Sequence, residues 1–379
     1  MDENVIDELL TRGVEEVLPD RETLKKRLMD GEKLRIKLGI DPTGERIHIG
    51  HSVPLLKLRD FQNLGHTVIF IVGDFTAVIG DTSDKESERP MLESSDIERN
   101  MASWREQVGK IIDVQKAEFR YNSEWLSELS YREIGEHANI FSLSNFISRE
   151  NIKRRLDAGS RVSLREVLYP LMQGYDSVAV KADVEVGGSD QRFNLLAGRD
   201  LQAHFGQRPQ HIMTFALATD ASGKKLSKTG GATVYITDDA ADMFGKVMSV
   251  PDDLMRQYFV SMTRVAMSEV ERVVSGHPKE AKMLLAHEIV RMYHGDRAAD
   301  AARDGFDATF SKGEVPENVQ EISLHDGEGD ADALVREKIV ESKTDYRRLE
   351  KAGAITQLSE DNTGRVLKIG KHRFVKIKK

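Results

Sequence analysis

The stretch between residues 34 and 72 constrains the fold more than any other part of this 379-residue chain. Apolar and polar residues alternate from 34 to 40 (LRIKLGI), which is the period-two pattern of a β-strand. The turn formers Asp41-Pro42-Thr43-Gly44 follow, and a helical stretch runs from about Gly50 to Leu64-Gly65, with Pro54 in its first turn. Residues 68–72 are all apolar, as expected of a parallel strand buried on both faces. The pattern predicts a β-α-β unit whose ligands bind at the carboxyl ends of its strands.

A second unit of the same kind is predicted later in the chain. Residues 182–186 form a strand candidate, and the turn Gly187-Gly188-Ser189-Asp190 leads into a helix that ends near Gly206. Residues 212–216 are typical of the next strand. Between the two units, residues 87–160 are predicted to be mostly helical, charged insertions. The expected fold class is α/β, with a parallel-sheet catalytic domain over residues 1–235.

The last fifty residues differ from the rest in charge. The whole chain has a net charge of −8, yet residues 331–379 hold 13 Lys and Arg against 7 Asp and Glu. A basic appendage on an acidic body indicates a polyanionic partner, although a solubilising tail would have the same charge. Apolar residues at 334–335, 339–340, 349 and 366–367 favour a folded RNA-binding module, because a solvated tail does not need them.

Amphipathic segments at 243–250 and 283–293 predict an α-helical domain at 236–326. The stretch Gly327–Asp330 is the expected linker from that domain to the basic module at 331–379.

Composition excludes several classes of protein. The chain has no cysteine, which excludes disulfides and thiolate metal sites. Its acidic first residues are not followed by a long apolar core, as a secretory signal would be, and no stretch approaches the length of a membrane span. These features predict a cytoplasmic protein.

Two histidines stand at the predicted start of the first helix. His48 and His51 are three residues apart, so on a helix they share one face, and Gly50 between them allows a bulky nucleotide to approach the backbone. We interpret the pair as a phosphate-binding element. A metal pair is disfavoured because no third ligand stands at helical spacing, and ordinary surface histidines are the remaining alternative.

A lysine-rich string follows the last predicted strand. Lys225-Leu226-Ser227-Lys228-Thr229 lies between Gly223 and Gly231, and glycine permits movement. Two ammonium groups at this place can neutralise charge that develops on a triphosphate. Such strings are often merely solvated, but this one follows a strand from which it can close over the same nucleotide.

Tyr169, Gln173 and Asp176 are spaced so that they fall on a single helical face. Ser163 and Glu166 resemble a capping box just upstream. A phenol, an amide and a carboxylate make a poor core face, because each needs a partner when buried, but they suit a small-molecule pocket. A polar solvent-facing surface is the alternative, and the apolar residues around the stripe disfavour it.

These motifs stand in the order in which they occur in bacterial-type tyrosyl-tRNA synthetases, and the chain resembles that family of class I aminoacyl-tRNA synthetases over nearly its whole length. The resemblance is carried by the lysine-rich string, the Tyr169 stripe and residues 39–43 (GIDPT), 48–51 (HIGH), 79–81 (IGD) and 187–191 (GGSDQ). Residues 331–379 resemble an S4 RNA-binding domain, with Tyr346-Arg347-Arg348-Leu349 and Gly353 in its helical half. The implied architecture is a Rossmann-like catalytic domain, a helical domain that contacts the anticodon stem, and a small α+β S4-like domain.

The resemblance implies a role for individual residues. The residues implied to bind the phosphates and stabilise the transition state are Thr43, His48, His51, Lys225, Lys228 and Thr229. Further contacts to ATP are implied for Gly39, Asp41, Gly50, Gly187, Gly188, Asp190, Gln191, Leu226 and Ser227. RNA would be bound by Arg347, Arg348, Lys351, Lys371 and Arg373.

The tyrosine site is implied in the same way. Asp81, Tyr169 and Gln173 would bind the ammonium group of tyrosine, and Asp176 would accept a hydrogen bond from its hydroxyl. A buried acceptor rejects phenylalanine, which cannot satisfy it, and tyrosyl-tRNA synthetases are the standard worked example of this discrimination. Lys37 stands where many members carry a second tyrosine that faces the hydroxyl, so its role at this site stays open.

The implied reaction has two steps. The tyrosine carboxylate attacks the α-phosphate of Mg²⁺-bound ATP, which gives tyrosyl-adenylate and pyrophosphate, and the 3′ end of tRNA(Tyr) then takes the tyrosyl group. No general base is assigned, because the carboxylate is already ionised and positioning with charge stabilisation suffices. No protein-bound metal is expected. The resemblance also implies a homodimer formed through the insertion at 87–160.

The chain departs from the family pattern at two further places. Its loop reads Lys-Leu-Ser-Lys-Thr rather than Lys-Met-Ser-Lys-Ser, which preserves both charges and the hydroxyl, and the S4 segment is shortened between Val340 and Thr344. Three other functions share part of the pattern. A tryptophanyl-tRNA synthetase shares the catalytic frame, but an indole offers no hydroxyl for Asp176. An inactive RNA-binding paralogue would use the S4 module alone, and a small-molecule nucleotidyltransferase would not need that module.

Overall fold

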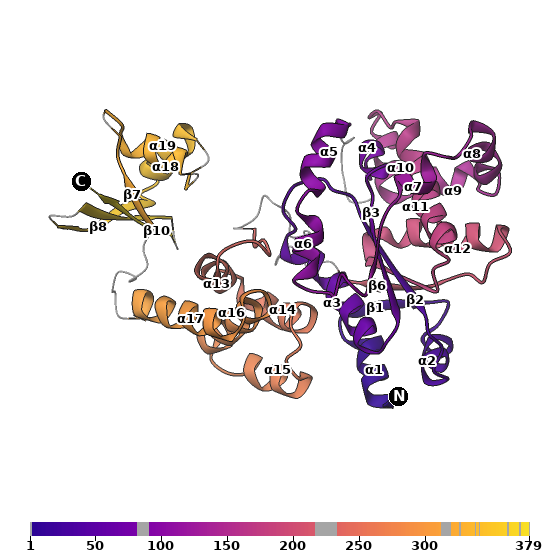
Figure 1. Ribbon diagram of the computed structural model, residues 1–379, viewed down its shortest axis with the longest axis horizontal. Coiled ribbons are helices and arrows are strands. Elements are labelled where there is room, and N and C mark those ends of the chain that lie inside the picture. Colours follow the sequence, from indigo (N-terminus) through magenta and orange to yellow (C-terminus); the bar gives the residue numbers. More distant parts are fainter. Residues whose placement is uncertain are drawn as a thin grey trace. The chain divides into compact units, whose positions relative to one another are not determined.

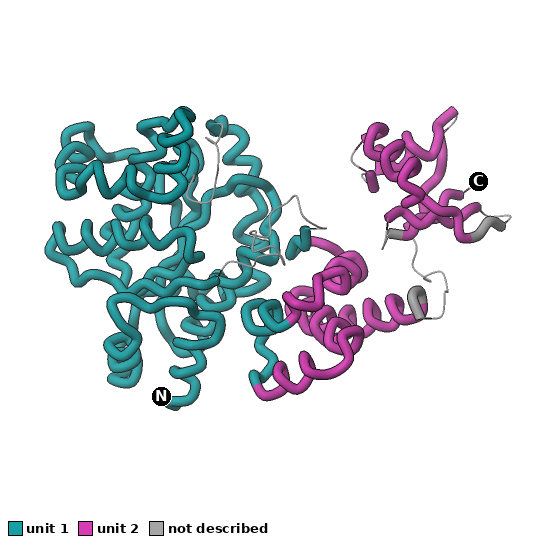
Figure 2. Tube along the Cα trace, turned by 180° about the vertical axis from the view of Figure 1, so that it is seen from behind, with its two compact units in different colours: residues 1–237, 256–267 teal, residues 238–255, 268–379 magenta. Residues whose placement is uncertain are grey.

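The computed structural model describes residues 2–81, 91–216, 233–311, 320–325, 327–337, 339–340, 342–361, 364–370 and 373–378. The chain divides into two compact units, one made of residues 1–237 and 256–267 and the other of residues 238–255 and 268–379 (Figure 2). Among the residues in these ranges, no helix is both long and apolar enough to cross a membrane.

In the first unit, the described residues form a six-stranded sheet with the order β1-β6-β5-β2-β3-β4 (Figure 1). Its strands are β1 (Val14–Leu18), β2 (Arg35–Ile40), β3 (Thr67–Val72), β4 (Glu118–Tyr121), β5 (Val184–Gly188) and β6 (His211–Phe215). Strands β2 to β6 pair in parallel, and β1 runs antiparallel to β6. The predicted α/β class with a parallel sheet is therefore confirmed.

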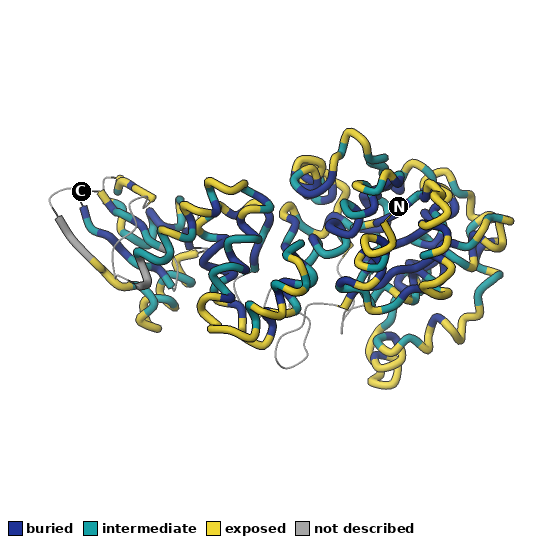
Figure 3. The backbone as a smooth tube through the Cα atoms, turned by 90° about the horizontal axis from the view of Figure 1, so that it is seen from below, coloured by how far each residue is buried: buried dark blue, intermediate teal, exposed yellow. Residues whose placement is uncertain are grey.

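Helices cover both faces of this sheet. Figure 1 shows α3 (Ile49–Asn63) and α6 (Trp104–Gly109) on one side of the strands, and α11 (Leu164–Val180) and α12 (Arg192–His204) on the other. The apolar strand β3 is buried from Val68 to Val72, and Figure 3 draws buried residues in dark blue. The two predicted β-α-β units correspond to β2-α3-β3 and β5-α12-β6. The unit's other helices are α1 (Glu3–Thr11), α2 (Arg21–Met29), α4 (Thr76–Ile79), α5 (Ser94–Met101), α7 (Ser123–Leu126), α8 (Tyr131–Ala138), α9 (Leu143–Ile147), α10 (Glu150–Asp157), the 3₁₀ turn η1 (Ser189–Gln191) and α14 (Met255–Met262).

Local side-chain chemistry fixes the start of α11, the helix that carries the predicted Tyr169 stripe. The backbone N–H of Ser163 donates to the Glu166 carboxylate at 3.0 Å, as the predicted capping box requires. The same carboxylate is buried and accepts two hydrogen bonds from the Arg155 guanidinium, at 2.6 and 3.2 Å. Because this ion pair is buried and bidentate, it fixes the position of the first turn of α11.

The described part of the predicted insertion, residues 91–160, is mostly helical, as expected, but it also supplies strand β4 at the edge of the sheet. Glu118 pairs with Ile69 of β3 in the strand register and accepts two hydrogen bonds from Arg35 of β2, at 2.7 and 2.9 Å. Phe119 packs on Phe70 with ring centroids 5.2 Å apart. These are contacts with residues distant in sequence, which is why a four-residue strand escaped the prediction.

The second unit contains a helical part and a small α+β part. The helical part consists of α13 (Ala240–Met248), the 3₁₀ turn η2 (Asp252–Leu254), α15 (Met267–Val274), α16 (Pro278–His294) and α17 (Asp296–Ser311). Within the predicted helical domain at 236–326, residues 256–267 belong to the first unit instead. There the Arg264 guanidinium pairs with Asp60 of α3 at 2.7 Å.

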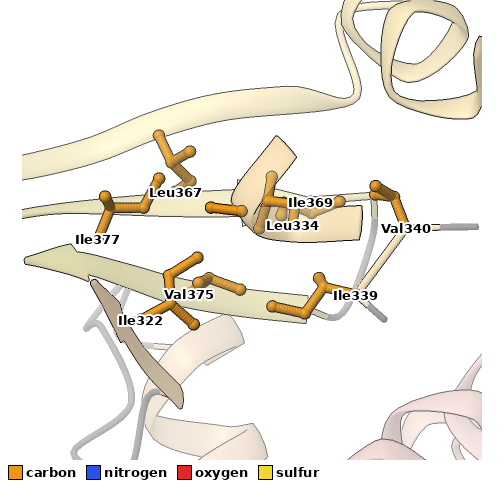
Figure 4. Close-up of a cluster of buried hydrophobic side chains, with 9 residues drawn as sticks. Ile322, Leu334, Ile339, Val340, Leu367, Ile369, Val375 and Ile377 are labelled. Carbon is orange, nitrogen blue, oxygen red and sulfur yellow. The ribbon is translucent and has the colours of Figure 1, made fainter. Parts of the chain in front are cut away.

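The α+β part is built from β7 (Gln320–Ser323), α18 (Asp330–Arg336), α19 (Lys343–Lys351), β8 (Ile355–Asp361), β9 (Gly364–Ile369) and β10 (Arg373–Lys378). The sheet order is β7-β10-β9-β8, and its core is apolar (Figure 4). Ile322 of β7 pairs in parallel with Ile377 of β10. This pairing precedes the predicted linker, so Gly327–Asp330 lies inside the module rather than before it, and the module's sheet begins at Gln320 instead of after residue 331.

Candidate active site

Asp41 follows the last residue of β2 and anchors a hydrogen-bonded cluster at the carboxyl ends of the central strands. Its carboxylate accepts a hydrogen bond from the Thr76 hydroxyl at 2.7 Å and another from the Tyr169 hydroxyl at 2.9 Å. Gly73, directly after β3, leaves room for this carboxylate, because a Cβ there would lie 2.0 Å from its Oδ1 atom. Thr43 is exposed, and its N–H donates to the Asp41 carbonyl at 2.8 Å. The cluster therefore lies where open α/β sheets bind their ligands.

The two predicted imidazoles lie together at the start of α3. Their ring centroids are 3.8 Å apart, and the rings are stacked with an interplanar angle of 22°. His48 is the N-cap residue, and its Nδ1 atom accepts a hydrogen bond from the N–H of Gly50 at 3.1 Å. A Cβ at Gly50 would lie 3.0 Å from the His48 ring, so any larger residue there would push this ring aside by a few tenths of an ångström. Both rings, with His51 one turn into the helix, stand at a helix N-terminus, which favours anions.

The chain after residue 232 pairs with residues 47–51, the segment that carries His48 and His51 and that we call the histidine turn. The N–H of Ile49 donates to the carbonyl of Val234 at 2.9 Å, and the N–H of Ile236 donates to the carbonyl of Ile47 at 3.0 Å. His48 and Tyr235 form an antiparallel β-bridge. The described residues that follow the lysine-rich string are therefore tied to the start of α3.

Asp176 ends the predicted polar stripe on α11 and is buried. Its carboxylate accepts hydrogen bonds from Nε1 of Trp125 at 2.8 Å and from Nδ2 of Asn122 at 3.4 Å. The Asn122 amide also donates to the Thr76 hydroxyl at 2.9 Å. Because Thr76 donates in turn to Asp41, one chain of hydrogen bonds joins the two carboxylates.

Burial alters the proton affinity of the stripe. It raises the pKa of the Asp176 carboxyl group to about 7, although the Lys37 charge and the hydrogen bonds from Trp125 and Asn122 lower it. Burial, and after it the charge of Asp41, also holds the pKa of the Tyr169 hydroxyl well above its usual value. Asp176 therefore exchanges its proton near neutral pH, whereas Tyr169 remains a hydrogen-bond donor.

The remaining tyrosine-site and ATP-site predictions fall around the same sheet edge. The Asp81 carboxylate accepts a hydrogen bond from Nε2 of Gln191 at 2.7 Å. Lys37 is buried on β2 and pairs with Glu185 of β5 at 2.8 Å. The glycine turn at 187–188 ends β5, with Asp190 in the 3₁₀ turn that follows, and Gly39 is exposed near the end of β2. Within the described ranges, no group of three or more Asp, Glu or His side chains could hold a metal ion.

The other predicted site residues lie outside the described residues or in the second unit. Lys225, Leu226, Ser227, Lys228 and Thr229 lie outside the described residues, as does Lys371. In the α+β part of the second unit, three predicted RNA-binding residues are exposed on α19, namely Arg347, Arg348 and Lys351. Arg373 is the first residue of β10.

Sequence reasoning missed three residues, Asn122, Trp125 and Glu185; it placed residues 74–81, and Thr76 with them, at the carboxyl ends of the strands but gave Thr76 no role. Asn122 directly follows β4, so recognising that strand would have placed it among the residues at the carboxyl ends. Glu185 is the one charged residue of β5 (VEVGG), and because it is buried there it needs a partner.

Comparisons with known proteins agree with this geometry. A family model described as tRNA synthetases class I (W and Y) matches residues 29–311. A tyrosine–tRNA ligase of Oleidesulfovibrio alaskensis is 42% identical, with 97% of each chain covered. Tyrosine–tRNA ligase 2 of Vibrio parahaemolyticus is 39% identical over the same shares of the two chains.

The fold is also similar to that of a solved structure, a C-terminally truncated mitochondrial tyrosyl-tRNA synthetase of Coccidioides posadasii. The TM-score is 0.65 at 26% identity, with 79% of this chain and 91% of that chain covered. The family model matches more than half of the sequence, and the curated relatives align with nearly all of it. The chain therefore belongs to the tyrosyl-tRNA synthetases, within the class I tRNA synthetases for tryptophan and tyrosine.

Proposed function

We propose that the protein joins tyrosine to tRNA(Tyr) in the two steps of adenylation and transfer. The observation that carries the proposal is the hydrogen-bonded cluster around Asp41, at the carboxyl ends of the central strands. The histidine turn follows β2, and Asp41 at the end of the same strand is bonded to Tyr169 of the polar stripe. A phosphate-binding element and an amino-acid-binding element thus share a strand end.

Adenylation needs charge stabilisation at the α-phosphate and at the departing pyrophosphate. Thr43, in the segment between β2 and α3, and His48 and His51, at the start of α3, would supply donors. ATP enters as its Mg²⁺ complex, so that ion is part of the substrate. One well-placed donor in such a site contributes about 3–4 kcal/mol. The lysine-rich string would add Lys225 and Lys228 together with the Thr229 hydroxyl. In support, β6 ends at Phe215 before that string, and the chain after it is bonded to the histidine turn.

The tyrosine ammonium group would be bound by Asp81, Tyr169 and Gln173. The Asp176 carboxylate would accept the phenol hydrogen bond. Trp125 holds this carboxylate from the side of α7, so its orientation is set before the substrate arrives. Trp125 and Asn122 would still donate to Asp176 when phenylalanine binds, but the acceptor position that the phenol hydroxyl takes would stay empty in a buried place, which penalises phenylalanine.

ATP would be bound further by the glycine turn at 187–188 with Asp190 and Gln191, and by the backbone around Gly39 and Gly50. tRNA would contact the exposed basic residues of the S4-like module. A homodimer formed through residues 87–160 and a cytoplasmic location belong to the same proposal. In this proposal the catalytic module carries out the reaction, and the helical and S4-like modules bind tRNA.

Amino-acid-dependent exchange of pyrophosphate into ATP tests the proposal. We expect efficient exchange with tyrosine and far slower exchange, measurable only at high concentrations of the amino acid, with tryptophan or phenylalanine. Exchange that is equally fast with tryptophan would favour the tryptophanyl alternative, and its absence with all three amino acids would favour an RNA-binding protein without catalysis.

The assignment of the phosphate-binding residues has its own test. His48→Ala and Lys228→Ala should each slow single-turnover formation of the adenylate by a factor of at least about a hundred. The dissociation constant for tyrosine should change little, because neither residue is assigned to the amino acid. Adenylate formation at the wild-type rate in both variants would defeat this assignment.

A further inference from the structure

Lys37 is completely enclosed in the middle of the sheet, with none of its surface exposed. Its ammonium group donates to the carbonyl of Gln173 at 3.1 Å and to the hydroxyl of Ser177 at 2.8 Å. It also lies 2.8 Å from Oε1 of Glu185. An ammonium group has three N–H donors, and these three acceptors use all of them. Lys37 therefore has no N–H left to offer a substrate hydroxyl.

Glu185, on the neighbouring strand β5, is equally enclosed. One carboxylate oxygen accepts hydrogen bonds from Ser177 at 2.9 Å and from the amide of Gln210 at 2.5 Å. The other oxygen, which pairs with Lys37, also lies 3.3 Å from the amide nitrogen of Gln173. The ion pair is thus both neutralised and hydrogen-bonded, which is what a buried pair needs in order to persist.

Gln173 is held at two points by this pair. Lys37 binds its backbone carbonyl, and Glu185 binds its side-chain amide. Gln173 is the middle residue of the stripe, between Tyr169 and Asp176 on the same helix. The pair therefore fixes how α11 is rotated on the sheet at the point where the stripe must face the site.

We propose that Lys37 is a positioning residue of the tyrosine site. Together with Glu185 it locks Gln173 and the middle of α11 to the sheet, and it does not bind the phenol hydroxyl. The inference rests on the proposed function, because the stripe is a tyrosine site only if that function holds. It gives Lys37 a different task from that of the second tyrosine found at this place in many family members.

Tyrosine and phenylalanine separate the two tasks, because they share an ammonium group and differ in the hydroxyl. If Lys37 bound the hydroxyl, loss of Lys37 would weaken the binding of tyrosine alone. As a positioning residue, Lys37 acts through Gln173, which is assigned to the ammonium group. Loss of Lys37 therefore weakens the binding of both amino acids alike.

The variant of choice is Lys37→Met combined with Glu185→Gln. Either change alone would leave one buried charge without its partner, which is strongly destabilising. Burial is the main cause of the raised pKa of Asp176; the Lys37 charge lowers that pKa and the Glu185 charge raises it. Removing both charges together therefore changes the field at Asp176 less than removing either one.

In pyrophosphate exchange by the full chain, we expect the double variant to show KM values for tyrosine and phenylalanine that are both raised roughly tenfold. The kcat values should stay within about threefold, and so should the ratio of kcat/KM between the two amino acids. Asp176→Asn is the comparison in which that ratio should collapse, since it alters the hydroxyl acceptor itself.

Lys57→Met provides a matched control. Lys57 is another buried lysine, on α3, and its ammonium donates to the carbonyls of Leu9 at 2.7 Å and Arg12 at 3.1 Å. Its loss should lower the melting temperature and leave both KM values unchanged, so an effect specific to the tyrosine site is separated from a general loss of stability.

If the double variant does not fold, Ser177→Ala tests the same idea more gently. It removes the hydroxyl that bridges Lys37 and Glu185, and both KM values should rise by about threefold. In either variant, a loss confined to tyrosine would overturn the proposal, and so would KM values equal to those of the wild type. Absence of tyrosine exchange in the wild-type protein would instead refute the proposed function.

Discussion

Replacing Asp176 by asparagine should raise the free energy of unfolding of the catalytic unit, and the gain should grow with pH. The reason is that the carboxyl group titrates at 3.8 in an ordinary setting but at about 7 in the folded protein, chiefly because of burial. Between these two values the folded protein holds a proton that the unfolded chain has released. Stability therefore falls as pH rises from about 4 to about 7 and no longer changes above that.

The magnitude follows from the shift of about three pKa units. Each unit corresponds to about 1.4 kcal/mol, so the ionised carboxylate costs about 4 kcal/mol above pH 7. At pH 5 the same reasoning gives about 1.5 kcal/mol. Asparagine has no such charge, and any misfit of its amide beside Trp125 or Asn122 is the same at both pH values. The advantage of the variant should thus increase by about 2.5 kcal/mol between pH 5 and pH 8.

Urea unfolding of both proteins at pH 5 and pH 8 measures this increase, because the other titrating groups are common to both and cancel in the difference. Tryptophan fluorescence is a suitable signal, since both tryptophans, Trp104 and Trp125, lie in the first unit. A stability difference between variant and wild type that is the same at the two pH values would refute the reasoning. The gain should coincide with a loss of discrimination against phenylalanine, because the costly charge is also the proposed phenol acceptor.

Two further outcomes follow from the same cluster. Trp125→Phe removes the N–H that lies 2.8 Å from Asp176 and opposes the effect of burial, so the pKa of that carboxyl group should rise further. When the pH is lowered from 9 to 6, the KM for tyrosine should rise as Asp176 becomes protonated, and in the variant this rise should start at a higher pH than in the wild type. Identical pH profiles of KM in the two proteins would contradict this. Gly73→Ala would place a methyl group 2.0 Å from Asp41 Oδ1, so we expect a loss of about 1–3 kcal/mol in urea unfolding and at least a tenfold drop in kcat/KM. Gly135→Ala, at an open position inside helix α8, should leave kcat/KM unchanged and raise the free energy of unfolding by up to about 1 kcal/mol, because alanine is the better helix former.

Much of this fold could be predicted from periodicity. The apolar run of β3, the alternating pattern of β2 and the turn signals around them are local features, and the parallel sheet confirms them. The edge strand β1 has two glutamates among its five residues and pairs with β6, a partner about 200 residues away. Strand β4 depends on Arg35 and Phe70 in the same way. Edge strands are decided by partners that a short sequence window does not contain.

In the site too, local features could be predicted from the sequence and contacts between distant residues could not. The histidine turn and the Tyr169 stripe could be predicted, because each lies within one helix and its spacing states which residues share a face. The partners that orient the stripe could not, since Trp125 and Asn122 come from α7 and the residue before it, some fifty positions upstream. The position of Lys37 was recognised, but its task depends on Glu185, and only the three-dimensional arrangement shows that its donors are all used.

The bonds of Lys57 have a practical consequence for anyone who shortens this protein. Its buried ammonium group donates to the carbonyls of Leu9, in the first helix, and of Arg12, directly after that helix. Deletion of the opening dozen residues would remove both acceptors and leave the buried ammonium group with only the more distant carboxylate of Asp60, 3.9 Å away. A purification tag fused ahead of the exposed Asp2 should be harmless, whereas trimming the amino terminus to aid crystallisation should yield insoluble material.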